Sequence, residues 1–280
     1  MNRKSGVPFI SRPLPGSLEW RLADGAGQSS ATHRVLERLI AVAYGLTYDE
    51  VVGGFPPYEV LLDQVAALVA RSVPDPTRRR SFTVLDPACG IGTVAARLAR
   101  EGYTVVGLDA VEHLVGVARA KIASGDGNPR FEHRDLARNP LPEAGTIDVL
   151  VSMHTLYWHP EPRAFLDACR RALKPQGHAV FLTYSRPARV LQTFREIRAG
   201  EGLRAALRSL RWLIPTAAFE RCRKYEPRYL SRDEFHQTLE DGGFEVLESR
   251  ETFLAGISLL AWARPREFRG GGAERNEHRG

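Results

Sequence analysis

Three aspartates follow apolar runs at regular intervals, and their types and spacing could bind one ligand that carries a cation and hydroxyl groups. Asp86 ends a short apolar run and begins the glycine loop 86–93, while Asp109 and Asp135 follow the next two apolar runs. Glycines let a backbone approach a ligand closely, and the helix expected after the loop supplies unpaired N–H groups. This loop therefore predicts a binding site for a dinucleotide or for another adenosyl cofactor.

The acid that precedes the glycines separates these candidate ligands. The G-x-G of the loop, followed by Ala95, also fits the loose dinucleotide pattern, which alone is a weak signal. Asp86 would repel a pyrophosphate but attract the ammonium group of a methionine. Asp109 could accept hydrogen bonds from both ribose hydroxyls, and Asp135 could accept one from an adenine amino group. We therefore expect S-adenosylmethionine as the cofactor, with S-adenosylhomocysteine as its product.

Residues after the fourth apolar run could supply a general base. A methyl carried by a sulfonium is already activated, so the protein mainly has to bring a nucleophile in line with it. A base helps when that nucleophile must also lose a proton. His154 follows the run 147–152 at the same end of the expected sheet and is the first candidate, with Tyr157 and His159 next. A lone histidine can equally be a hydrogen-bonded structural residue.

The stretch from about Phe82 to Tyr184 resembles the class I S-adenosylmethionine-dependent methyltransferases, in the branch that modifies small molecules. The resemblance rests on the glycine loop, Asp109, Asp135, the segment IDVLVSMHTL at 147–156 and the segment LKPQG at 173–177, in this order. It implies an α/β, Rossmann-like fold, with a seven-stranded mixed sheet whose last strand is antiparallel and helices on both faces. A helical N-terminal segment and a helical cap insertion complete the expected architecture.

The resemblance also implies a set of cofactor-binding residues along these motifs. Around the methionine part it places Asp86, Ala88, Gly90, Gly92 and Thr93, with Ser152 or Met153 beside them. Asp109 is implied at the ribose, and Ala110, Asp135 and Leu136 at the adenine. Tyr48 and Tyr58 belong to the N-terminal helical region, which in related methyltransferases folds over the cofactor. No metal site is expected, because the three cysteines are scattered along the chain.

The pattern of apolar residues predicts how these residues are positioned. Helical spacing marks two amphipathic segments that begin near Thr32 and Val60, and from Phe82 onward short apolar runs alternate with helical segments. Such alternation is typical of a parallel sheet covered on both faces, which binds ligands at the carboxyl ends of its strands. We divide the chain into a flexible arm (1–30), a helical N-terminal cap (31–80), a cofactor-binding core (81–185), a helical substrate-cap insertion (186–230), the C-terminal part of the core sheet (231–265) and a disordered tail (266–280).

The charge of the chain does not point to a nucleic-acid partner. The net charge is +6, but the two ends, 1–24 and 264–280, together carry four of these six charges, so the body is close to neutral. A grip on phosphates would need a denser basic surface. The Asn/Asp-Pro-Pro-aromatic and Pro-Cys motifs of DNA methyltransferases are also missing after the fourth run. No run reaches the roughly 20 apolar residues of a membrane span, and the first residues lack the apolar stretch of a signal peptide. We expect a cytoplasmic protein without a membrane partner; a homodimer stays open.

Aromatic residues near the expected cofactor site indicate the class of acceptor. They fall in the N-terminal helical region, at Tyr44, Tyr48, Phe55 and Tyr58, and in the insertion, at Trp212, Phe219 and Tyr225. They favour an apolar or aromatic small molecule, such as a bacterial secondary metabolite of natural product biosynthesis, methylated at C, N or O. An NAD(P)-dependent oxidoreductase is the enzymatic alternative, although its usual Tyr-Lys pair is hard to place in a chain with four lysines. A methyltransferase fold that binds without turnover is the other alternative.

Overall fold

The computed structural model describes residues 53–73, 75–122, 129–141, 143–222 and 227–266. Tyr44, Tyr48, Tyr225 and the helix expected from Thr32 lie outside these ranges, as do the arm 1–30 and nearly all of the tail 266–280.

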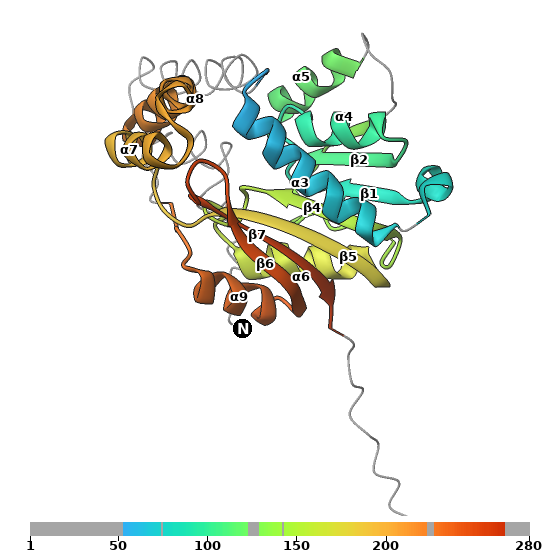
Figure 1. The fold of residues 1–280 in the computed structure, drawn as a ribbon. Coiled ribbons are helices and arrows are strands. Elements are labelled where there is room, and N and C mark those ends of the chain that lie inside the picture. Colours follow the sequence, from blue (N-terminus) through green and yellow to red (C-terminus); the bar gives the residue numbers. More distant parts are fainter. Residues whose placement is uncertain (1–52, 74, 123–128, 142, 223–226, 267–280) are drawn as a thin grey trace, which may run out of the picture.

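Seven strands form one mixed sheet in the order β3-β2-β1-β4-β5-β7-β6 (Figure 1). Their bounds are β1 Thr83–Asp86, β2 Thr104–Asp109, β3 Arg130–His133, β4 Ile147–Met153, β5 Leu173–Tyr184, β6 Phe244–Thr252 and β7 Ser258–Pro265. Strands β1 to β5 pair in parallel, and β7 runs antiparallel between β5 and β6. The expected fold class and its antiparallel last strand are confirmed. The strand order reverses between β1 and β4, and ligands of such sheets bind at the carboxyl ends of the strands there.

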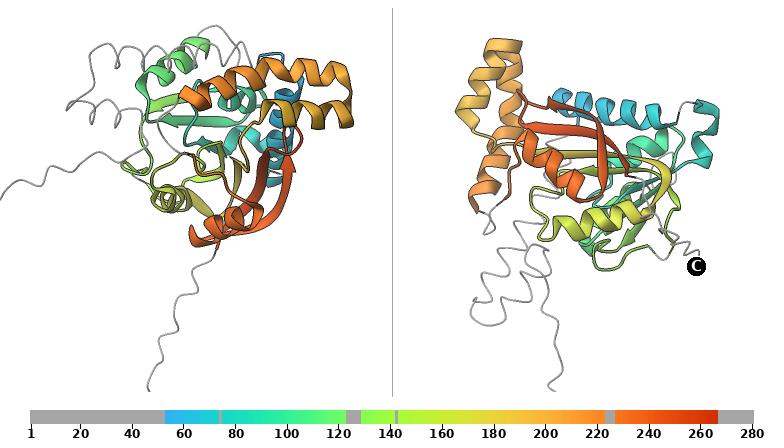
Figure 2. Two further views of the ribbon diagram at one scale, coloured as in Figure 1. Left: turned by 90° about the vertical axis from the view of Figure 1, so that its left-hand side faces the viewer. Right: turned by 90° about the horizontal axis from the view of Figure 1, so that it is seen from below.

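Helices cover both faces of this sheet. Their bounds are α3 Pro56–Ser72, the 3-10 helix η1 Pro76–Ser81, α4 Thr93–Arg100, α5 Glu112–Ile122, α6 Pro162–Ala172, α7 Val190–Glu201, α8 Leu203–Cys222 and α9 Arg232–Asp241. Helices α3, α4 and α5 bury their apolar residues in one core, and α6 and α9 bury theirs in a second core on the opposite face (Figures 1 and 2). Helices α7 and α8 form a hairpin along one side of the molecule.

The sequence pattern did not locate the start of strand β5 or the position of helix α7. β5 begins at Leu173, five residues before the apolar run that starts at His178, because Leu173 pairs with Ile147 across an irregularity in the register. Helix α7 lies in the insertion 186–230 that was expected to be helical, but no apolar pattern marked its position. This helix buries only Thr193 and Ile197, and two buried positions leave almost no apolar period to recognise.

Helix α8 is the long helix of the insertion that was expected to be helical, and its apolar residues do not share one buried face. Leu203, Leu207 and Ile214 are exposed, whereas Ala206 and Leu213 are buried. Apolar spacing alone does not separate the two sets, because positions three, four and seven apart lie near one another on a helix. The separation between the two sets comes from the packing partners, which the local pattern does not contain.

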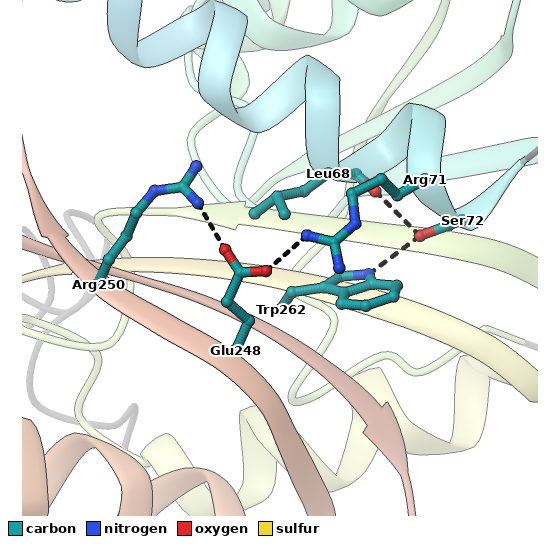
Figure 3. Close-up of polar contacts among 6 residues, drawn as sticks. All are labelled: Leu68, Arg71, Ser72, Glu248, Arg250 and Trp262. Atoms are coloured by element: carbon teal, nitrogen blue, oxygen red, sulfur yellow. Dashed lines mark hydrogen bonds and ion pairs between the residues drawn. The ribbon is translucent and has the colours of Figure 1, made fainter.

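Helix α3 is fastened to the β6–β7 hairpin at its C-terminal end (Figure 3). Arg71 lies over the ring of Trp262, 4.3 Å from its centroid, and pairs with Glu248 at 2.5 Å. The Trp262 Nε1–H donates to Ser72 Oγ at 3.1 Å, and Arg250 holds the other carboxylate oxygen of Glu248 at 2.6 Å. These contacts fix the direction of α3, whose opposite end carries aromatic residues toward the carboxyl ends of the strands.

Candidate functional site

The carboxyl ends of β1 and β2 place two aspartates side by side in a buried setting. Asp109 accepts the backbone N–H of Gly90 at 2.8 Å and that of Val111 at 2.8 Å, so its carboxylate ties the glycine loop to the second strand. Burial, together with the charge of Asp109, raises the pKa of Asp86 to about 8. Burial likewise raises the pKa of Asp109. A cation bound beside these two acids, at the ends of adjacent strands, would favour their ionised forms.

The glycine loop takes a conformation that other residues would resist. Gly90 and Gly92 have φ of 52° and 78°, in the left-handed region. A Cβ on Gly92 would come within 2.5 Å of the ring of Phe131, so this position admits no side chain, whereas a Cβ on Gly90 would meet nothing within 4 Å. Gly92 is also the N-cap of α4, and the free N–H groups of that helix face the loop. The loop therefore leaves open space against the backbone at Gly90.

A cavity of about 230 Å³ lies over this loop. Its walls include nine of the residues expected at the cofactor and base positions: Tyr58, Asp86, Ala88, Gly90, Thr93, Asp109, Met153, His154 and Tyr157. The hydroxyl of Thr93 is buried and has no hydrogen-bond partner among the described residues. Gly92 and Ser152 lie outside this cavity, Gly92 at the loop–helix junction and Ser152 buried within β4.

A second cavity lies beside the first, at the ends of β2 and β3. It is lined by Asp109, Ala110, Asp135 and Leu136, which are the residues expected at the ribose and the adenine, and also by Trp158 and His159. Asp135 accepts the backbone N–H of Ala137 at 3.0 Å, which orders the turn after β3. Asp109 and Ala88 line both cavities, so the two hollows meet at the end of β2.

His154 sits in the first cavity in an uncommon conformation. Its φ is 53°, in the left-handed region that residues other than glycine rarely adopt. The imidazole stacks on the ring of Tyr184, with centroids 3.8 Å apart and planes 15° from parallel. Both ring nitrogens are buried and have no hydrogen-bond partner among the described residues. Burial lowers the pKa of His154 to about 3, so the imidazole is neutral at pH 7.

The structure separates the other two candidate bases. Tyr157 lines the cavity of His154 and meets Tyr184 edge to face at 4.9 Å. His159 lies in the second cavity instead, where its Nδ1 accepts the backbone N–H of Glu161 at 3.1 Å. With Nδ1 occupied as an acceptor, the neutral ring carries its proton on Nε2. His159 is therefore placed beside the residues expected at the adenine, and only Tyr157 shares the position expected for a base.

An aromatic wall borders the first cavity: Tyr58 and Tyr184 line it, and Trp212 and Phe253 pack behind them. The sequence indicated Tyr58 and Trp212 but neither Tyr184 nor Phe253. Tyr184 stacks on His154, and the ring centroid of Trp212, in α8, lies 6.2 Å from that of Tyr184. Phe253 meets Trp212 edge to face, with ring centroids 5.0 Å apart. Phe253 also meets Tyr58 edge to face at 6.4 Å. These rings come from α3, β5, α8 and the β6–β7 turn, so no single stretch of sequence signals the wall.

The β6–β7 turn that supplies Phe253 is left-handed over three residues that are not glycine. Phe253, Leu254 and Ala255 have φ of 59°, 40° and 60°, and Gly256 follows at 76°. The Ile257 N–H donates to the carbonyl of Phe253 at 3.0 Å, closing one left-handed helical turn. Such backbone costs roughly 1–2 kcal/mol per residue. The burial of Phe253 and Leu254 in the core offsets that cost.

Two further observations concern classes of site within the described residues. They hold no group of three or more histidine, cysteine, aspartate or glutamate side chains arranged to bind a metal ion. In the same part of the chain, no helix is long and apolar enough to cross a bilayer.

Comparison with known proteins identifies the family of this chain. A family described as "Methyltransferase domain" matches residues 57–249. A ubiquinone biosynthesis O-methyltransferase from Cronobacter sakazakii is 34% identical over 106 residues, which are 38% of this chain and 44% of that protein. Another enzyme of that name, from Dinoroseobacter shibae, is 30% identical over 188 residues, or 67% of this chain and 69% of the relative. The chain thus spans less than half the length of several curated relatives it matches.

Solved structures share the fold at low sequence identity. The PH0226 protein from Pyrococcus horikoshii has a TM-score of 0.54 at 20% identity, covering 75% of this chain and 91% of that one. A magnesium protoporphyrin IX methyltransferase from Synechocystis, solved with bound S-adenosylhomocysteine, has a TM-score of 0.50 at 18% identity, covering 89% and 92%. Together with the family match, these findings confirm the expected resemblance: the chain belongs to the class I S-adenosylmethionine-dependent methyltransferases.

Proposed function

We propose that this protein transfers the methyl group of S-adenosylmethionine to a hydroxyl oxygen of an apolar, aromatic small molecule. The observation that carries the proposal is His154, a neutral imidazole buried between the glycine loop and the aromatic wall. The relatives named as ubiquinone biosynthesis O-methyltransferases support oxygen as the acceptor atom. A secondary metabolite and a quinone precursor both satisfy this description of the acceptor.

The residues around the two cavities fit the cofactor. Asp86, buried and adjacent to Asp109, would receive the ammonium of the methionine part. The open space at Gly90 allows close approach to the backbone, and the unpartnered hydroxyl of Thr93 has room to accept or donate a hydrogen bond. In the second cavity Asp109 would hold the ribose, while Asp135 would hold the adenine beside Leu136 and His159.

His154 would act on the acceptor rather than on the cofactor. The bound cofactor supplies an activated methyl. As the new O–CH₃ bond forms and the S–CH₃ bond breaks, the hydroxyl proton of the acceptor passes to an imidazole nitrogen of His154. A pKa near 3 keeps that nitrogen unprotonated in the resting protein, and stacking on Tyr184 fixes the plane of the ring at the cavity wall. The aromatic wall excludes water and offers ring faces to a planar acceptor.

The test uses methyl-labelled S-adenosylmethionine with a panel of apolar phenols, and mass spectrometry of the products. His154→Ala should lower turnover by roughly 10²–10⁴-fold and leave the affinity for S-adenosylhomocysteine nearly unchanged. His159→Ala is the matched control: it should weaken S-adenosylhomocysteine binding and affect turnover mainly through that loss. Full turnover by His154→Ala with intact cofactor affinity would exclude the imidazole as the base. Labelling of carbon or nitrogen alone would overturn the choice of oxygen.

A further inference from the structure

Helix α8 carries two apolar stripes, of which only one is used inside the protein. Ala206, Ser209 and Leu213 are buried against the body. Leu203, Leu207 and Ile214 are 53%, 54% and 56% exposed, and they form a second stripe with the half-buried Leu210 between them. The spacing of four, three and four residues keeps that stripe straight along one side of the helix. A continuous row of exposed leucine and isoleucine is uncommon on a surface that faces only water, and it marks an interaction site.

Arginines flank the exposed stripe on the same hairpin. Arg204, Arg208 and Arg211 repeat at four and three residues, which places them on the face next to the leucines. Arg204 and Arg208 are exposed and form no ion pair with any other residue that the structure describes. The hairpin, from Val190 to Cys222, holds six arginines and three glutamates, and one of the glutamates, Glu196, pairs with Arg186 at 2.7 Å.

Helix α7 repeats this arrangement. Leu191, the most exposed large apolar residue described at 73%, shares its face with Arg195 and Arg198, at four and seven residues' distance. Seen from its own side of the molecule, the hairpin lies along the surface (Figure 2, left). Both helices therefore present leucine beside arginine at the periphery of the fold.

We infer that the α7–α8 hairpin docks on an anionic lipid bilayer. Leu203, Leu207 and Ile214 enter the boundary between headgroups and acyl chains, and Arg204 and Arg208 bind lipid phosphates. An amphipathic helix that lies in the interface binds through buried apolar area and through attraction to anionic lipids, and it needs no spanning segment. The expectation that no membrane partner exists rested on spanning segments alone, so it does not bear on this mode.

Charge favours a bilayer over a second copy of the chain. A symmetric dimer through this face would bring the same patch onto itself, setting arginines against arginines with few carboxylates between them. Like charges in such an arrangement oppose association. Anionic headgroups provide the complementary charge, and the acyl boundary accepts the apolar stripe.

The hairpin also adjoins the proposed acceptor cavity. Trp212 of α8 is buried and contacts Tyr184, whose ring lines that cavity. Docking would thus bring the aromatic wall close to the source of a lipid-soluble acceptor. This last step rests on the proposed function, whereas the docking itself does not.

The experiment is co-sedimentation of the full chain with vesicles of phosphatidylcholine, with and without phosphatidylglycerol, at low and high salt. Wild type should bind the vesicles that contain phosphatidylglycerol, and salt should weaken binding. Leu207→Gln/Ile214→Gln and Arg204→Gln/Arg208→Gln should each reduce that binding by about tenfold or more. Matched controls are Val60→Gln, at an apolar residue of α3 that is 55% exposed, and Arg78→Gln/Arg80→Gln, which removes the same charge elsewhere.

Each outcome below either supports or overturns docking on the bilayer. Circular dichroism checks that the variants are folded. Loss in the hairpin variants with binding retained in both controls supports docking. Absence of wild-type binding to anionic vesicles overturns it, as does equal loss in the charge control, which would show attraction by net charge alone. Dimerisation of the wild type, abolished by Leu207→Gln/Ile214→Gln in sedimentation without lipid, would also overturn it. Methyl transfer plays no part in these readouts, so failure of the proposed function leaves them unaffected.

Discussion

Binding of the cofactor should release a proton from Asp86. The pKa of this carboxyl is about 8, raised by burial and by the neighbouring Asp109. At pH 7 about nine in ten ligand-free molecules therefore carry the proton on Asp86. A methionine ammonium placed against the carboxyl stabilises the ionised form, so the proton leaves when the ligand binds.

The same shift makes the ligand-free protein sensitive to pH. The pKa of Asp86 in the folded state lies above its value of 3.8 in the unfolded chain. Its contribution to stability is therefore fully present below about pH 4 and is lost as pH rises through about 8. Between those limits the change amounts to on the order of 6 kcal/mol. Asp86→Asn removes the titrating group, so its unfolding free energy should vary less over this range.

Calorimetry of S-adenosylhomocysteine binding, in buffers with different ionisation enthalpies, counts the released proton. We expect the release of close to one proton per bound ligand at pH 7 and close to none at pH 9, where Asp86 is already ionised. Asp86→Asn should bind more weakly and release none, whereas the exposed Asp75→Asn should behave as wild type. Thermal unfolding without ligand should show the melting temperature of wild type falling from pH 5 to pH 9. A proton count that is unchanged in Asp86→Asn, or that does not depend on pH, would refute the reasoning.

Three other predictions, two substitutions and one pH profile, follow from the same geometry. Gly92→Ala should lose both stability and S-adenosylhomocysteine binding, because φ is 78° and the new Cβ would strike an aromatic ring; Gly116→Ala, a helical site with open space, should instead stabilise by up to about 1 kcal/mol. Phe253→Ala should cost roughly 3–5 kcal/mol in a denaturation experiment and also weaken cofactor binding through the wall. Phe244→Ala, buried on the opposite face of the sheet, should cost a similar amount of stability and leave cofactor affinity intact. In the pH profile of kcat/KM, the acid limb should show no inflection near 6.5 from His154, whose pKa is about 3; an inflection there that vanishes in His154→Gln would contradict the buried, neutral imidazole.

The cofactor half of the site could be predicted from the sequence because it depends on local signals. Asp86, Asp109 and Asp135 each follow an apolar run, and parallel pairing brings the carboxyl ends of such runs together. The glycines reveal where the backbone must turn through the left-handed region. Alternation of strands and helices predicts the parallel sheet, whereas the seven strands and the antiparallel last strand were implied by the resemblance. The roles of the three aspartates and the glycines toward the cofactor stay predictions until binding is measured.

The positions of the two histidines could not be predicted in this way. His154 and His159 are five residues apart after the same strand, yet they line different cavities. The separation arises from the left-handed backbone at His154 and from the turn in which Glu161 donates its N–H to His159. A histidine carries no sequence signal for positive φ, so the pattern could only group the two residues together.

The aromatic wall could be predicted only in part, at Tyr58 and Trp212, and for a different physical reason. Tyr58, Tyr184, Trp212 and Phe253 are distant in sequence, and each meets the next through ring edges and faces rather than through backbone pairing. Phe253, which contacts both Tyr58 and Trp212, belongs to a left-handed turn, and it is not a glycine, so the sequence does not indicate its positive φ. Strand ends of a Rossmann-like sheet suffice to place the residues proposed for the cofactor, whereas the aromatic wall proposed for the acceptor depends on how α3, α8 and the β6–β7 turn pack. Changes in those elements can therefore alter the acceptor while the three aspartates and the glycine loop stay as they are.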